Sequence, residues 1–142
     1  MTPSQVGAFL DVPRTSSLAT VDGRGHPHQA AMWFLHGDGE LLMWTYGSAQ
    51  KAVNLRGNPA ASLLVEEGSE YDSLRGVMVR GQVTLIEDFA RVREIGLGLY
   101  ARYRIRTSAA ESAGEFVDRQ LRKRVGISLP MTRVVSWDHS RL

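Results

Sequence analysis

Thr45, Ser48 and Lys51 lie close together in the sequence and carry the side-chain chemistry of an anion site. The aromatic and apolar run at 41–46 predicts a strand, and the polar turn after it predicts a short helix with Ser48 as its cap. A lysine in the first turn of a helix is unfavourable, because a helix start carries about half a positive charge. Hydroxyls, an amine and free backbone N–H groups that converge on one point are the donors that hold a phosphate. The sequence therefore indicates a phosphate site, and the alternative is a solvated lysine on a connecting helix.

The distribution of cations is uneven along the chain. There are only two lysines but fifteen arginines, which argues against Lys51 as a general surface cation. Residues 1–88 hold six basic and ten acidic side chains (net −4), whereas residues 89–142 hold eleven and five (net +6). A basic half is typical of nucleic-acid binding, of an anionic ligand, or of a helix solvated by arginine, and the last is the usual case.

Much familiar catalytic chemistry is missing from the sequence. There is no cysteine, which excludes disulfides, thiolate metal sites and cysteine nucleophiles. His26 and His28 are separated by a proline and have no carboxylate cluster nearby, so no metal site is expected. The sequence has no Walker loop, no Gly-x-Gly-x-x-Gly, no Gly-x-Ser-x-Gly elbow and no His-Glu-x-x-His helix. If the protein is an enzyme, we expect a bound cofactor to carry the reaction and no side chain to act as the catalyst.

The composition predicts a single folded domain over residues 1–142. A hydrophobic fraction of 43% and a charged fraction of 23% are typical of globular proteins. No apolar run approaches the roughly 20 residues that a membrane span needs, and we expect no signal peptide. Together with the lack of cysteine, these features favour a cytoplasmic protein.

The hydrophobic periodicity predicts a mainly β protein, a β-barrel of six or seven mostly antiparallel strands with attached helices. The first three strands are expected to form an antiparallel meander through tight turns at Asp22-Gly23 and Gly37-Asp38-Gly39. Gly96 and Gly98 in a long amphipathic helix suggest close packing against a sheet or a partner. The strand at 61–65 is expected to be buried on both faces. The expected strands are 17–21, 28–35, 41–46, 61–65, 76–86, 125–129 and 133–137, and the expected helices are 4–10, 49–56, 88–103 and about 116–121.

With these elements in order, the chain resembles the split β-barrel superfamily of pyridoxamine 5'-phosphate oxidase-like proteins. Within that superfamily it is similar to the short branch of flavin- and deazaflavin (F420)-dependent oxidoreductases. The most specific match is the Thr45-to-Lys51 spacing, followed by Asn54 and the Asn58-Pro59 pair. The similarity covers nearly the whole chain and implies an FMN-binding-like split barrel. Further matching pieces are residues 18–23, 74–77, 80–81 and 133–138.

The resemblance also implies a cofactor site and a subunit partner. Similar proteins are homodimers with two cofactor sites at the subunit interface, and they act on small molecules, with neither nucleic acid nor membrane as a partner. No side chain is implied as a catalyst, although Tyr46 or solvent can return a proton. By resemblance, Thr45, Ser48, Gln50 and Lys51 hold the phosphate, Asn54 braces the helix behind it, Ala31, Met32 and Trp33 line the flat ring, and Arg75 and Arg80 lie near the ring or the phosphate.

Coenzyme F420 is the cofactor that the resemblance favours, with FMN as the alternative. The end His139-Ser140-Arg141 reverses the Arg-x-His arrangement of authentic pyridoxine-phosphate oxidases, which argues against vitamin B6 oxidation. Gln50 stands where many relatives have an arginine, so the pocket is less positive. The short branch with Arg75-Gly76 mostly uses the deazaflavin, whose oligoglutamate tail suits the basic second half. The implied activity is hydride transfer between reduced F420 and a small unsaturated organic substrate.

Two alternatives belong to other functional classes. One is a non-catalytic module that binds or sequesters the cofactor. The other is a small barrel that binds nucleic acid through its basic half. The helical spacing of the basic residues, with the aromatic residues turned partly inward, instead favours a solvated helix face, which is our preferred interpretation. The candidate surface would be Arg91, Arg93, Arg102, Arg104 and Arg106 with Tyr100 and Tyr103.

Overall fold

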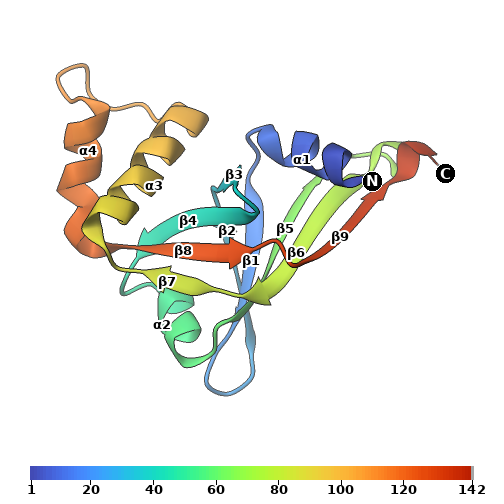
Figure 1. Ribbon diagram of the computed structural model, residues 1–142, viewed down its shortest axis with the longest axis horizontal. Coiled ribbons are helices and arrows are strands. Elements are labelled where there is room, and N and C mark those ends of the chain that lie inside the picture. The colour runs from blue at the N-terminus through green and yellow to red at the C-terminus, as the bar shows by residue number, and fades with distance from the viewer. Residues whose placement is uncertain (142) are drawn as a thin grey trace.

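The computed structural model describes residues 1–141, which form two antiparallel sheets and four α-helices (Figure 1). The five-stranded sheet has the order β2-β1-β5-β6-β9, and the four-stranded sheet has the order β3-β4-β8-β7. The strands are β1 (Ser16–Val21), β2 (Pro27–Met32), β3 (Leu35–Gly37), β4 (Glu40–Tyr46), β5 (Ala60–Glu67), β6 (Arg75–Gln82), β7 (Thr84–Ile86), β8 (Arg124–Pro130) and β9 (Arg133–Asp138). The α-helices are α1 (Pro3–Asp11), α2 (Gln50–Gly57), α3 (Phe89–Tyr103) and α4 (Ala113–Gln120), and single 3-10 turns are η1 (Tyr71–Ser73), η2 (Leu121–Lys123) and η3 (His139–Arg141).

The chain passes from one sheet to the other at two places where a single long strand was expected. The expected strand 28–35 is divided at Trp33 and Phe34 into β2 and β3, and the expected strand 76–86 is divided at Val83 into β6 and β7. The predicted three-strand meander is therefore wrong, because β1 and β2 pair in one sheet whereas β4 pairs with β3 and β8 in the other.

Tyr103 explains how the chain can leave the sheet at Phe34. The Phe34 N–H donates to the Tyr103 hydroxyl at 3.2 Å, and that hydroxyl donates to the Arg14 carbonyl at 2.8 Å. The ring of Phe34 is fully buried, while Trp33 is 45% exposed and stacks on Tyr103. A buried backbone group must find a partner, and here a side chain from α3 takes the place of a neighbouring strand.

The helices lie at different ends of the two sheets (Figure 1). The helices α3 and α4 lie side by side at one end, whereas α1 and both chain ends lie at the other, and α2 lies on the opposite side of the sheets from α1. The expected close packing at Gly96 and Gly98 is confirmed. A Cβ at Gly96 would lie 2.6 Å from Trp44, and one at Gly98 would lie 2.7 Å from Leu35. These glycines let α3 approach the four-stranded sheet.

The outer face of the five-stranded sheet carries a row of small and apolar side chains. The strand pairings place one residue from each strand side by side, and we call this set the outer row: Ala31, Ser17, Leu64, Met78 and Val135. Burial on both faces was predicted for 61–65, but within one chain only Leu63 and Val65 are buried and Leu64 is partly exposed. None of the helices in residues 1–141 has the length and apolar character needed to cross a bilayer.

Candidate functional site

Lys51 and Thr45 meet at the start of α2, as their spacing predicts. The Lys51 Nζ donates to the Thr45 Oγ1 at 3.3 Å, and Thr45 is buried at the end of β4. The predicted cap is wrong, because Ala49 occupies the N-cap position and no side chain caps the helix. Ser48 is exposed in the turn just before. The first amides of α2 and the Ser48 hydroxyl are therefore available to a ligand.

Arg124 adds a second cation beside Lys51. It lies opposite Tyr46 in the β4–β8 ladder, with its guanidinium carbon 3.8 Å from the Tyr46 ring centroid and 4.7 Å from that of Trp44. Sequence reasoning missed Arg124, because only the pairing of β4 with β8 brings it to Lys51. We call Thr45, Ser48, Lys51 and Arg124 the Lys51 cluster.

The charges of the Lys51 cluster are not neutralised within the described chain. Burial, and then the charge of Arg124, lower the pKa of Lys51. Burial also lowers the pKa of the Arg124 guanidinium. Among residues 1–141, neither cation has a carboxylate within ion-pair distance. Two partly buried like charges without a counter-ion are unfavourable, and a bound anion would relieve that cost.

Gln50 and Asn54 hold α2 against the five-stranded sheet. The Gln50 Nε2 donates to the Asn54 Oδ1 at 2.7 Å, and the Asn54 Nδ2 donates to the Thr20 Oγ1 on β1 at 3.0 Å. Asn54 is 4% exposed, so this link is protected from water. Asn54 thus links α2 to β1, whereas the amide nitrogen of Gln50 is engaged within the helix.

A pocket of about 470 Å³ lies between the two sheets and the α3–α4 pair, and we call it the seam pocket. Its volume is in the range of about 300–1,000 Å³ that is common for small-molecule sites. Trp33 forms one wall and is stacked on Tyr103 with a centroid distance of 4.7 Å and an interplanar angle of 8°. Because Arg124 belongs to both, the seam pocket adjoins the Lys51 cluster. The lining residues are Thr15, Ala31, Met32, Trp33, Trp44, Leu99, Ile105, Phe116 and Arg124.

The structure brings the expected ring residues Ala31, Met32 and Trp33 together in the seam pocket, but it places Arg75 and Arg80 elsewhere. Arg75 forms an ion pair with Glu67, which also binds Arg14, and its guanidinium lies over the Phe9 ring. Arg80 is exposed and lines a different hollow, on the outer face of the five-stranded sheet.

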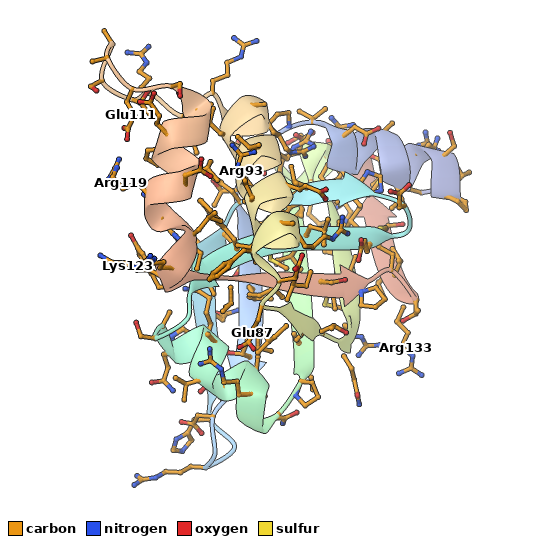
Figure 2. The ribbon with its side chains drawn as sticks, turned by 60° about the vertical axis from the view of Figure 1, so that its left-hand side comes forward. Glu87, Arg93, Glu111, Arg119, Lys123 and Arg133 are labelled. Atoms are coloured by element: carbon orange, nitrogen blue, oxygen red, sulfur yellow. The ribbon has the colours of Figure 1, made fainter. Side chains whose placement is uncertain are left out.

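Several arginines of the basic half have partners within the chain. Arg91 pairs with Glu40, and Arg93 pairs with Asp118 across the α3–α4 pair. Arg102 donates to the carbonyl oxygens of Leu10 and Val12. Arg119 of α4 pairs with Glu111 and points outward, as does Lys123 on η2 just after α4 (Figure 2). Within residues 1–141, no three histidine, aspartate or glutamate side chains lie close enough to hold a metal ion.

Two antiparallel sheets with a pocket at their junction define a split β-barrel. The chain belongs to the pyridoxamine 5'-phosphate oxidase family, whose profile matches residues 2–137. Among curated proteins, none matches the chain.

Solved structures agree with this assignment. A conserved hypothetical protein from Mycobacterium tuberculosis is 37% identical, with a TM-score of 0.87 over 98% of this chain and 86% of that one. A protein described as an F420 reductase is 26% identical, with a TM-score of 0.72 over 94% of this chain and 98% of that one. An FAD-binding protein from Mesorhizobium loti is 16% identical and shares the fold, with a TM-score of 0.72 over 96% of this chain and 94% of that one. The split-barrel fold of this chain is thus shared with an F420 reductase and with an FAD-binding protein.

Proposed function

We propose that this protein is an oxidoreductase that binds coenzyme F420 and passes a hydride between the reduced deazaflavin and a small unsaturated organic substrate. The observation that carries the proposal is the Lys51 cluster, a pair of unneutralised cations at the uncapped start of α2 that adjoins an aromatic-lined pocket. The 26% identity to an F420 reductase supports the deazaflavin. FMN is the alternative, because it offers the same phosphate and flat ring.

The residues present fit such a cofactor. Lys51, Arg124, the Thr45 and Ser48 hydroxyls and the first amides of α2 supply donors for a phosphate. Ala31, Met32 and Trp33 supply a wall for a flat ring. The cofactor supplies the hydride when it is bound.

The chain itself would bind and orient the cofactor and would exclude water from the site. The rigid link from Asn54 to Thr20 keeps α2 in place before the ligand arrives, which lowers the cost of binding. No carboxylate or imidazole of the described chain lines the seam pocket, so a proton would come from solvent or from Tyr46 beside Arg124. A non-catalytic cofactor-binding module would use the same contacts and is distinguished by the absence of turnover.

Replacing Lys51 tests the proposed site. F420 should bind the purified protein and its fluorescence should be quenched, and Lys51→Ala should weaken binding by about 10–100-fold, because a hydrogen bond to a charged group contributes about 1.5–3 kcal/mol. Lys123→Ala is the matched control, since that lysine points outward (Figure 2) and should have no effect. Tight FMN uptake with no response to F420 would favour the flavin alternative, and indifference to both would refute the proposed site.

We also propose that two copies of the chain pair through the outer row, with the cofactor sites at the interface. Val135 is 45% exposed, and Leu64 and Met78 beside it are only partly covered within one chain. An apolar surface of this kind favours burial against a partner. Thr15 and Ala31 line both the seam pocket and a neighbouring hollow on this face, so a second copy there would border the cofactor site.

A further inference from the structure

One end of the seam pocket is built from side chains that the proposed cofactor contacts do not use. Leu99 comes from α3, Ile105 follows that helix, and Phe116 comes from α4. We infer that this helical end binds the substrate, and that the substrate is a flat, uncharged ring compound. The inference rests on the proposed function, because it assigns the part of the pocket at β2 to the cofactor ring and the part at α3 and α4 to the substrate.

Packing makes the aromatic surfaces of the pocket rigid. Gly96 lets Trp44 and Val117 approach α3 so closely that a Cβ would lie within 2.9 Å of both. Trp33 is backed by Tyr103, whose hydroxyl is tied to backbone groups. Phe116 contacts the Tyr100 ring with a centroid distance of 5.8 Å. Aromatic side chains from three separate segments thus face one cavity, and such surfaces bind flat rings by stacked or edge-to-face contact.

The charge of the pocket excludes a cationic substrate. In the described chain, Arg124 is the ionised residue that lines the pocket, and Lys51 adds to its field. With no carboxylate in the lining, a cation would lose hydration without gaining a partner. An anionic substrate would compete with the cofactor phosphate for Arg124. An uncharged ring avoids both costs and buries the apolar surface that Leu99, Ile105 and Phe116 offer.

Ile105 and Phe116 are the residues that should set the shape of the acceptor. Leu99 is 2% exposed and belongs to the packing of α3, whereas Ile105 and Phe116 are only partly buried. Shortening either of these two should enlarge the helical end without removing core packing. Two independent variants keep the test open if one of them disturbs the α3–α4 pair.

The tryptophans provide a readout that does not depend on activity. Two of the three, Trp33 and Trp44, line the seam pocket, whereas Trp137 lies on β9 against Gly76. The probes are quinoline, a neutral fused ring at pH 7, and N-methylquinolinium, its permanently charged counterpart. Each is titrated into the protein with and without oxidised F420 while the three indole N–H resonances are followed by NMR.

We expect quinoline to shift the Trp33 and Trp44 resonances saturably and to leave that of Trp137 unchanged. N-methylquinolinium should bind at least about tenfold more weakly, which corresponds to about 1.4 kcal/mol. Phe116→Ala and Ile105→Ala should each weaken quinoline binding by about five- to tenfold and change F420 affinity less than twofold. Phe89→Ala is the control, because Phe89 is 60% exposed and lies outside the pocket lining.

The outcomes separate this inference from the proposed function. F420 binding without any quinoline shift at Trp33 or Trp44 would overturn the substrate assignment and leave the cofactor proposal standing. If Phe116→Ala loses F420 affinity and quinoline affinity equally, the helical end belongs to the cofactor, and the substrate assignment is again overturned. If the protein binds quinoline but not F420, the assignment of the helical end would be supported and F420 would be refuted as the cofactor.

Discussion

Lys51 carries its charge where the backbone is already positive and where Arg124 adds a second cation. Its placement on a helix start could be predicted from the sequence, because a strand, a polar turn and a lysine are local features. The role of Arg124 could not, because it depends on which strand pairs with β4. The predicted Ser48 cap is wrong because the helix begins one residue later than expected, at Gln50, with Ala49 as its N-cap residue.

The ionisation of Lys51 gives a pH dependence with a definite sign. Burial and Arg124 lower its pKa from 10.5, so the folded chain without ligand loses this charge at a lower pH than a free lysine does. A bound phosphate favours the charged form, so F420 affinity should fall as pH rises through the lowered pKa. Lys51→Arg should retain affinity to higher pH, because arginine stays protonated.

This dependence can be measured directly. With ¹³Cε-labelled lysine the chain gives only two side-chain resonances, and Lys123→Arg identifies that of Lys51. The titration midpoint of the Lys51 resonance should lie below pH 10.5 in the free protein and should move to higher pH when F420 is bound. A midpoint at or above 10.5 without ligand would contradict the crowded, partly buried environment of this amine.

At the scale of elements, the turns could be predicted from their residue types. The sheet to which each strand belongs could not. The turn at Asp38 and Gly39 was predictable because both residues adopt positive φ, of 53° and 74°, which these residue types tolerate. The break at Phe34 was not, because its backbone partner is a tyrosine hydroxyl from α3, far along the chain. Alternation along a strand indicates a buried face but not which sheet the strand joins.

Gly96→Ala tests the contact between α3 and the four-stranded sheet. The added methyl would lie 2.6 Å from Trp44 and 2.9 Å from Val117, so we expect a loss of about 1–3 kcal/mol in the free energy of unfolding. Denaturant titration gives this value. Gly57→Ala, where no atom lies within 4 Å of the new methyl, is the control and should cost little or nothing. Equal stabilities of the two variants would mean that α3 can move away from β4 without cost.

At the scale of the whole molecule, the mainly β barrel class was predictable because composition and alternation constrain it. The apolar run at 61–65 was expected to be buried on both faces, yet one chain covers only one of them. The outer row supplies the reason: Leu64 aligns with Met78 and Val135 on a face that a second chain could cover. The apolar run at 61–65 is thus the pattern that the proposed dimer would require.

Met78→Arg tests that assembly. Light scattering after size exclusion should give about twice the chain mass of 15.7 kDa for the native protein and the single chain mass for the variant. Burying an unpaired cation at an interface costs on the order of several kcal/mol. Phe89→Arg introduces the same charge at an exposed site outside the outer row and should leave the mass unchanged. A native protein that elutes as a single chain would refute the dimer.

The scarcity of lysine has a practical consequence for handling this protein. Dyes, resins and cross-linkers that react with primary amines can reach only Lys51, Lys123 and the chain start. A lowered pKa leaves more of the Lys51 amine in its reactive, unprotonated form at mild alkaline pH. Conjugation through amines would therefore modify the proposed phosphate site itself, whereas arginine-rich surfaces elsewhere would remain untouched.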